Sequence, residues 1–122
     1  MSADADRLAE FLRELAQALH VSGMPAHDLE RQLNATGQRL GIRVDCFAVL
    51  TMLTLSITAG DRTQRIEMLR LRFYDYNMAR LIALEALLGE IDAIAGIDRC
   101  AHKLRAIMSA PALWSGLSLI HI

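Results

Sequence analysis

A glycine–proline junction between two amphipathic segments constrains the fold of this chain more than any other feature. Hydrophobic residues recur at helical spacing over residues 6–21, which predicts a first helix. Gly23 is placed to end that helix in a left-handed cap, and Pro25 suits the first turn of a second helix. The second helix carries a leucine stripe, with small residues midway that allow close approach, and it ends at Gly41. The chain therefore begins with two helices joined by a sharply defined turn.

After Gly41 the hydrophobic period changes from helical spacing to alternation. Apolar residues alternate with mostly polar ones over residues 44–48 and 53–58, which predicts two strands. Residues 59–61, Ala-Gly-Asp, are a predicted turn, and residues 63–72 are a predicted third strand.

Helical spacing returns in the last third of the chain. It predicts a helix over residues 76–94 and a shorter one that begins at Ile97 and stops at Pro111. The order of two helices, three strands and two helices (ααβββαα) predicts an α+β fold with the helices on one face of a small antiparallel sheet. At 122 residues the chain is one domain by length, and we expect residues 1–112 to form it.

Residues 113–122 are apolar and too short to span a bilayer, which takes about 20 residues. We expect them to be either the start of a membrane segment or, over residues 117–122, read-through of a sequencing adapter. The sequence of residues 117–122 is what a common transposon-library adapter encodes in one reading frame. On that interpretation the natural chain continues after Gly116, and this chain is a fragment.

Composition narrows the function classes. Hydrophobic residues make up 53% and charged residues only 22%, so either the core is aliphatic or some apolar surface meets a partner or a membrane. The net charge of -1 argues against a nucleic-acid partner. The acidic N-terminus lacks the basic and apolar regions of a secretory signal. Two cysteines argue against a disulfide framework, and we expect Cys46 and Cys100 to be small core residues of a protein in a reducing compartment.

A pattern of small, apolar and acidic residues runs from the first helix into the first strand: Leu19, Ser22, Gly23, Pro25, Leu29, Glu30, Leu33, Leu40, Gly41, Val44 and Asp45. The strand over residues 53–58, an Asn-Met helix start at Asn77 and a Pro-x-x-Trp at Pro111 follow in order. In this order and spacing, residues 8–114 resemble the soluble N-terminal domain of the threonine/serine exporter family.

The resemblance implies an inner-membrane exporter of small amino acids (threonine/serine) or, in a split two-subunit branch, of small carboxylates. This domain would lie at the cytoplasmic face of the bacterial inner membrane. Its partner would be the membrane-embedded part of the same protein or a partner exporter subunit. The chain contains no transmembrane span, so transport itself is expected to reside elsewhere, and gating, assembly and hydrolysis remain open as roles.

Four residues are candidates for a substrate or regulatory site: Ser22, Gly23, Glu30 and Asp45. The junction can present backbone N–H groups at a helix N-terminus to a carboxylate ligand. Helix capping and the helix dipole already explain Ser22, Gly23 and Glu30, so we favour this structural interpretation. Asp45 lies early in a strand, where aspartate is disfavoured, and an edge position or a salt bridge is favoured over a proton or substrate site.

No cofactor or metal site is predicted. The histidines show no short ligand spacing, although two of them flank the junction and can meet in space: His20, His27, His102 and His121. Several arginines cluster on the third strand and just before it: Arg62, Arg65, Arg70 and Arg72. They form either a solvated strand face, which we favour, or a contact for anionic lipid of the inner leaflet.

Two other classes stay open beside the exporter domain. A helix, turn and helix followed by a hairpin resembles a winged DNA-binding regulator, but the second helix begins with Asp28 and Glu30, whose charges would face phosphate. A small hydrolase or ligand-binding domain is the other alternative. Because no Gly-x-Ser-x-Gly pattern appears, we expect no enzyme.

Overall fold

The computed structural model describes residues 2–49, 51–58, 64–71 and 75–110. The elements in chain order are α1 (Ser2–Ser22), α2 (Ala26–Leu40), β1 (Arg43–Val49), β2 (Met52–Thr58), β3 (Gln64–Arg70), α3 (Met78–Leu88), the single 3-10 turn η1 (Ile94–Gly96) and α4 (Ile97–Ser109). This order confirms the predicted α+β class and the ααβββαα arrangement.

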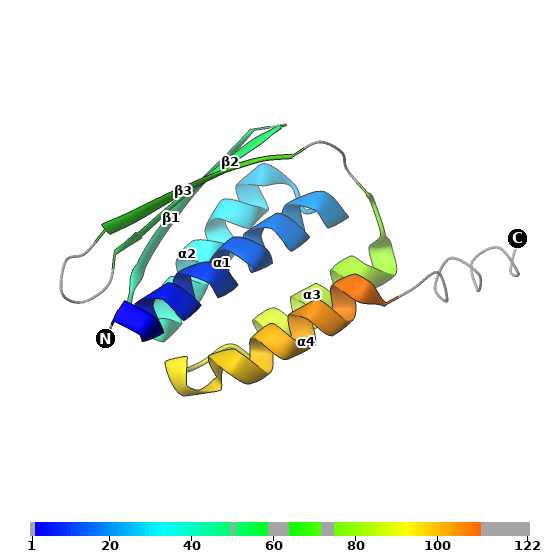
Figure 1. The fold of residues 1–122 in the computed structure, drawn as a ribbon. Coiled ribbons are helices and arrows are strands. Elements are labelled where there is room, and N and C mark those ends of the chain that lie inside the picture. Colours follow the sequence, from blue (N-terminus) through cyan, green and yellow to red (C-terminus); the bar gives the residue numbers. More distant parts are fainter. Residues whose placement is uncertain (1, 50, 59–63, 72–74, 111–122) are drawn as a thin grey trace, which may run out of the picture.

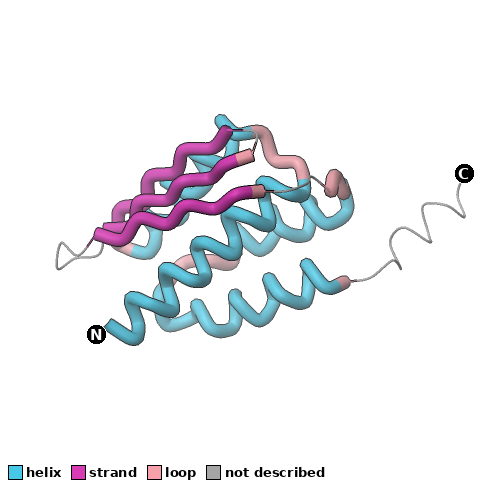
Figure 2. The backbone as a smooth tube through the Cα atoms, turned by 45° about the horizontal axis from the view of Figure 1, so that its top comes forward, coloured by secondary structure: helices cyan, strands magenta, loops and turns pink. Residues whose placement is uncertain are grey.

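The described part of the chain forms a sheet covered by helices on one side. The strands lie in the order β1-β2-β3, and both neighbouring pairs are antiparallel. Figure 1 shows α1 and α2 beneath the sheet, with α3 and α4 packed on the other side of α1. The tube view in Figure 2 shows the three strands side by side above this helical layer. Helix α1 is therefore the central element of the molecule.

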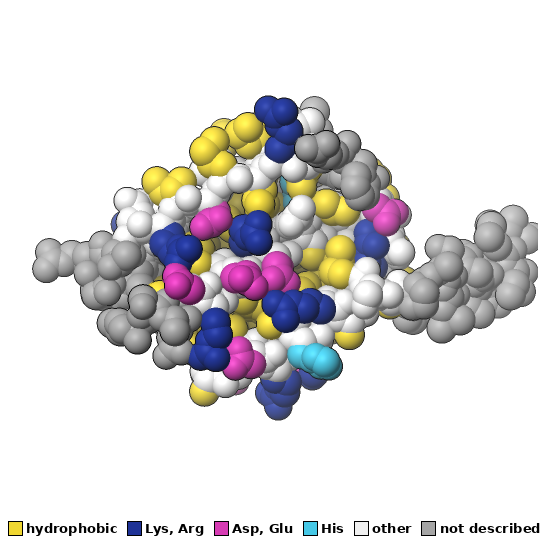
Figure 3. Space-filling model, viewed as in Figure 1, with side chains coloured by type: hydrophobic (Ala, Val, Ile, Leu, Met, Phe, Trp, Pro, Cys, Tyr) yellow, Lys and Arg dark blue, Asp and Glu magenta, His cyan; other side chains and the backbone are white. Residues whose placement is uncertain are grey.

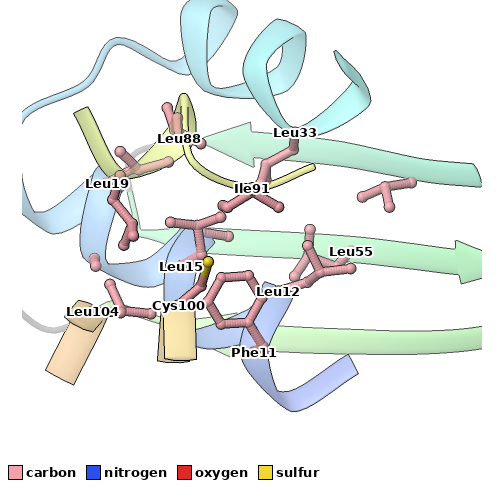
Figure 4. Close-up of a cluster of buried hydrophobic side chains, with 14 of the residues drawn as sticks. Phe11, Leu12, Leu15, Leu19, Leu33, Leu55, Leu88, Ile91, Cys100 and Leu104 are labelled. Carbon is pink, nitrogen blue, oxygen red and sulfur yellow. The ribbon is translucent and has the colours of Figure 1, made fainter. Parts of the chain in front are cut away.

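The hydrophobic core is built around α1. Phe11, Leu12, Leu15 and Leu19 are at most 2% exposed, because they project from a helix that is covered both by the sheet and by α3 and α4. Figure 4 shows these side chains gathered with Leu33 of α2, Leu55 of β2 and Leu104 of α4, among others. Each fully buried leucine contributes roughly 1.5–3 kcal/mol to stability. Many of the aliphatic residues in which the sequence is rich lie in this core.

Two glycines end the first two helices, as predicted. At the end of α1, Gly23 has a φ of 117°, and the next amide, Met24 N, donates to the carbonyl of Leu19 at 3.0 Å. An equivalent bond closes α2 beyond Gly41, whose φ is 76°. Both arrangements satisfy carbonyls that a helix end leaves without partners. Pro25 is the N-cap residue of α2 and not part of its first turn, a correction of one position.

The packing of α2 on β1 depends on Gly37. A Cβ atom at this position would lie 2.8 Å from Val44 Cγ2 and 3.1 Å from the carbonyl oxygen of Ile42. The close approach that the small residues predicted is therefore present. It lets the stripe of Leu29 and Leu33, both fully buried, reach the inner face of the sheet.

The predicted helix over residues 76–94 was too long at both ends. Asn77 is the N-cap of α3, and its side-chain oxygen accepts a hydrogen bond from Arg80 N at 3.0 Å. At the other end, the Arg39 guanidinium of α2 donates to the carbonyls of Leu88 (2.8 Å) and Ile91 (2.9 Å). These carbonyls have a side-chain donor in place of another helical turn, so α3 ends at Leu88 and the chain turns toward η1. The first helix, by contrast, begins at Ser2, before its predicted start.

Several predictions fall outside the described residues. They concern the turn at residues 59–61, the two ends of the predicted third strand at 63 and 72, the stop at Pro111 and the segment 113–122. Within the described part of the chain, none of the helices combines the length and the apolarity needed to cross a bilayer.

Candidate functional site

The junction between α1 and α2 is also the attachment point of α3. The hydroxyl of Ser22, which is 2% exposed as a residue, accepts a hydrogen bond from Arg80 Nε at 2.9 Å. The same guanidinium donates to a carboxylate oxygen of Asp75 (3.2 Å) and to its carbonyl oxygen (2.7 Å). The Arg80 side chain is only 11% exposed, so its hydrogen bond to Ser22 is held away from solvent, whereas the Asp75 side chain is 57% exposed.

Backbone hydrogen bonds strengthen this attachment. The Asp75 amide donates to the carbonyl of Val21 at 2.9 Å, and the Asn77 amide donates to the carbonyl of Ser22 at 3.3 Å. These carbonyls belong to the last turn of α1, where a helix has no internal donors left. Residues that enter α3 therefore supply the cap of α1.

Gly23 permits this contact in two ways. Its positive φ is a conformation that side chains rarely adopt, and a Cβ atom here would lie 2.5 Å from Cδ1 of the Tyr76 ring. The ring therefore lies directly against the glycine backbone. In the described part of the chain, neither an imidazole nor a carboxylate contacts the Ser22 hydroxyl, so the junction offers no activated nucleophile.

Glu30 lies at a different place, along the outer edge of β1. One of its carboxylate oxygens accepts a hydrogen bond from Ala48 N at 3.3 Å, and Asn34, one turn later on α2, donates to the carbonyl of Val44 at 3.4 Å. Side chains of α2 therefore satisfy groups that an edge strand leaves unpaired. Burial, together with the negative charge of Glu30, raises the pKa of the Cys46 thiol to about 12, so this thiol stays protonated at neutral pH.

Asp45 lies on the opposite face of the sheet from Glu30. Its exposed carboxylate pairs with Arg43 Nε at 3.1 Å within the same strand. The structure thus brings Ser22 and Gly23 together, whereas Glu30 and Asp45 lie apart from them and from each other.

The other singled-out residues lie apart as well. His20 is buried and its Nε2 lies 3.2 Å from the carbonyl oxygen of Val49, whereas His27 is exposed on α2. Among the described residues, no group of three histidine, cysteine or acidic side chains could hold a metal ion. Arg65 pairs with Asp6 of α1. Arg70 is exposed. Two further positions, Arg62 and Arg72, are outside the described residues.

Sequence reasoning missed the two arginines that organise the helices. Arg80 binds the α1–α2 junction, and Arg39 binds the end of α3. Each can be recognised in the sequence: Arg80 is the only basic residue of α3, whose other residues are apolar except Glu85, and Arg39 is the basic residue of the last turn of α2. Besides nearby acceptors, each arginine donates to oxygens of a distant segment, Ser22 for Arg80 and Leu88 and Ile91 for Arg39, which no local pattern identifies.

The surface divides into an apolar and a mixed-charge region. Figure 3 shows hydrophobic side chains gathered at the upper left over the sheet, while acidic and basic side chains alternate over the helices. The alternation matches exposed ion pairs between α1 and α4, such as Arg105 with Glu14 at 3.1 Å and Arg7 with Asp98 at 3.1 Å. Exposed pairs of this kind contribute little to stability, at most about 1 kcal/mol each.

Comparison with known proteins identifies one family. A family model, ThrE, described as "Putative threonine/serine exporter", matches residues 10–121. Neither the curated proteins nor the solved structures give a match to this chain. The family model covers nearly the whole chain and confirms the resemblance seen in the sequence, so the chain belongs to the threonine/serine exporter family.

Proposed function

We propose that this chain is the cytosolic N-terminal domain of an inner-membrane exporter of threonine and serine, or of small carboxylates, and that it has a regulatory or assembly role. The family supports the link to export. The structure supports a role beside transport, because the described helices are too short or too polar to form a transport path through a bilayer.

The outer face of the sheet carries this proposal. Four large apolar side chains on it are 46–65% exposed: Phe47, Val49, Ile66 and Met68. Phe47 lies opposite Thr54 in the β1–β2 pair, and Thr54 lies opposite Met68 in the β2–β3 pair, so these side chains share one face. An antiparallel sheet with helices on one side normally turns polar residues to water on the other side. An apolar outer face is instead typical of a surface that meets a partner.

We assign this face to the membrane-embedded part of the exporter. An exporter must contain spans. Apolar side chains of β1 and β3 flank the polar Thr54 and Ser56 of the central strand, and Arg43 and Arg70 lie at opposite ends of the strands, which suits a partner near anionic head groups. Ser22, Gly23, Glu30 and Asp45 would then serve by position. Ser22 and Gly23 would hold α3, and Glu30 would hold β1, behind the docking face, whereas Asp45 lies on that face beside Arg43.

The test uses cells that express the chain together with the membrane-embedded part of the exporter. The double variant Phe47→Ser/Met68→Ser should lower threonine efflux and abolish co-purification with the membrane part, while thermal unfolding of the purified chain stays unchanged, because surface changes cost at most about 0.5 kcal/mol. The control Thr54→Ser, on the same face, should leave all three measurements unaltered. Normal efflux and co-purification in the double variant would overturn the proposal. Sedimentation of the chain with anionic vesicles alone, lost in the double variant, would identify lipid as the occupant instead.

No observation favours the two other classes. Helix α2, the recognition helix of a winged-helix interpretation, packs along β1, where Glu30 is engaged with the strand edge. A hydrolase requires a nucleophile with an adjacent base, whereas the Ser22 hydroxyl accepts a hydrogen bond from the Arg80 guanidinium.

A further inference from the structure

A polar hollow opens between α2 and α3, away from the junction and from the outer face of the sheet. It has a volume of about 280 Å³ and is lined by Gln32 and Arg39 of α2 and by Glu85, Leu88 and Gly89 at the end of α3. Pockets for drug-sized ligands have roughly 300–1,000 Å³. This hollow therefore suits a solute of few atoms.

A fixed cation lines one side of the hollow. Arg39 donates through Nε to the carbonyl of Ile91 at 2.9 Å and through Nη2 to the carbonyl of Leu88 at 2.8 Å. Its Nη2 also reaches the hydroxyl of Thr36 at 3.4 Å. The Nη1 donors, by contrast, have no acceptor among the described residues. The guanidinium is thus held in one orientation, with the N–H donors of Nη1 left for a ligand and a positive charge that favours a carboxylate.

An anion lines the same hollow without neutralising this cation. Glu85 makes no ion pair and no side-chain hydrogen bond within the described part of the chain, although Arg39 shares the hollow with it. The side-chain amide of Gln32 is likewise without a partner there. Arg39 and Glu85 are both exposed, and they line one hollow without pairing, so a small molecule that carries both charges can contact both side chains.

We propose that this hollow binds a free α-amino acid as its zwitterion, with threonine and serine as the preferred ligands. Arg39 would bind the α-carboxylate, Glu85 the α-ammonium group, and the Gln32 amide the side-chain hydroxyl. Gly89, which has no side chain, leaves the space open, and Leu88 offers an apolar contact for the threonine methyl group. The choice of threonine and serine rests on the proposed function. Binding would report the cytosolic level of the exported solute to the domain.

Occupancy has a structural consequence that makes the site regulatory. A ligand held by Arg39 and Glu85 bridges α2 to the end of α3 and so restrains the relative position of these helices. Because the hollow is open to solvent, we expect weak binding, with Kd on the order of 1 mM. A weak affinity of this kind would respond to an excess of amino acid and not to trace amounts.

The test is a titration of the purified full chain, followed by amide chemical shifts in NMR spectra. L-threonine should give saturable shifts at α2 and the end of α3. Propionate, which lacks the ammonium group, and ethanolamine, which lacks the carboxylate, should bind at least about tenfold more weakly. No saturable shifts with threonine, or equal binding of all three probes, would overturn the assignment.

Variants separate the site from general charge effects. Glu85→Gln should weaken threonine binding by about tenfold, and its thermal unfolding should match that of the parent chain. Glu10→Gln is the matched control, because it removes the same charge from an exposed position of α1 that lies near Arg105. Unchanged binding in Glu85→Gln, or an equal loss in Glu10→Gln, would refute the site. A chain that supports threonine efflux but binds no threonine refutes this inference alone, whereas normal efflux without an intact outer sheet face refutes the proposed function alone.

Discussion

The close approach of Gly37 in α2 to β1 gives the sharpest prediction, that Gly37→Ala destabilises the fold. In an ordinary helix this change stabilises by about 1 kcal/mol, because alanine has the higher helix propensity. Here the added Cβ would lie 2.8 Å from Val44 Cγ2, 3.1 Å from Val44 Cβ and 3.1 Å from the Ile42 carbonyl oxygen. These atoms belong to the backbone or to a short branched side chain of a strand, so they yield little.

The two effects oppose each other, and their magnitudes decide the sign. Overpacking a close contact costs about 1–3 kcal/mol, and the rigidity of the neighbours places Gly37→Ala in the upper half of that range. After the propensity gain, the free energy of unfolding should fall by about 1–2 kcal/mol. For a domain of this size, Tm should fall by about 4–8 °C.

A double-mutant cycle with Val44→Ala tests the cause. Val44→Ala alone leaves a cavity and costs about 2 kcal/mol. In the double variant the new methyl group occupies space that the valine vacated, so the combined loss should be smaller than the sum by about 1 kcal/mol. Urea unfolding monitored by circular dichroism measures all three variants. Ala35→Gly, on the same helix, calibrates propensity alone. A rise in Tm for Gly37→Ala, or strict additivity with Val44→Ala, would show that the helix does not approach the strand this closely.

Further predictions concern the junction and the strand edge. Gly23→Ala should lower the free energy of unfolding by about 2–3 kcal/mol, from its positive φ and the contact with Tyr76, and a neutral result in thermal unfolding would contradict that packing. Arg80→Met should lower the free energy of unfolding in urea by about 2 kcal/mol, because it leaves the buried Ser22 hydroxyl without its partner. A decrease below about 0.5 kcal/mol would count against the network. The thiol of Cys46, with its pKa raised to about 12 by burial and by Glu30, should resist iodoacetamide at neutral pH. The protonated Cys46 thiol contributes fully to stability below the unfolded-state pKa near 9, and this contribution is lost as the pH rises toward 12. Glu30→Gln removes a negative charge that raises this pKa, so it should shift the pH profile of alkylation, measured by mass spectrometry, to lower pH.

The sequence predicts the local elements of this fold well, for physical reasons that can be named. The cap at Gly23 and the stripe of Leu29 and Leu33 depend on neighbours within two helical turns, so the order of residues is sufficient. The end of α3 was missed because an arginine distant in sequence, Arg39, supplies the donors that stop it. The same limit applies to the site.

Ser22 was recognised as a marker, but its partner Arg80 comes from another helix, and only the folded chain brings them together. The separation of Glu30 from Asp45 shows a second limit. Both appeared in one continuous pattern, yet strand alternation places Asp45 on the face of the sheet that the helices do not cover, whereas Glu30 belongs to a covering helix. Nearness along the chain did not mean nearness in space.

The unequal edges of the sheet limit how copies of this chain can associate through their strands. On β1, Glu30 and Asn34 already occupy backbone groups at the outer edge, whereas β3 has no strand beyond it among the described residues. Among the described residues, β3 is therefore the edge that is more open to a strand of a second copy. In a pair of copies joined through their β3 strands, the edges that remain are the two β1 strands, where Glu30 and Asn34 already bind backbone groups. A third copy would then have no open β3 edge to join. We therefore expect strand-mediated association of this fold to end in a closed dimer and not to propagate into a fibre.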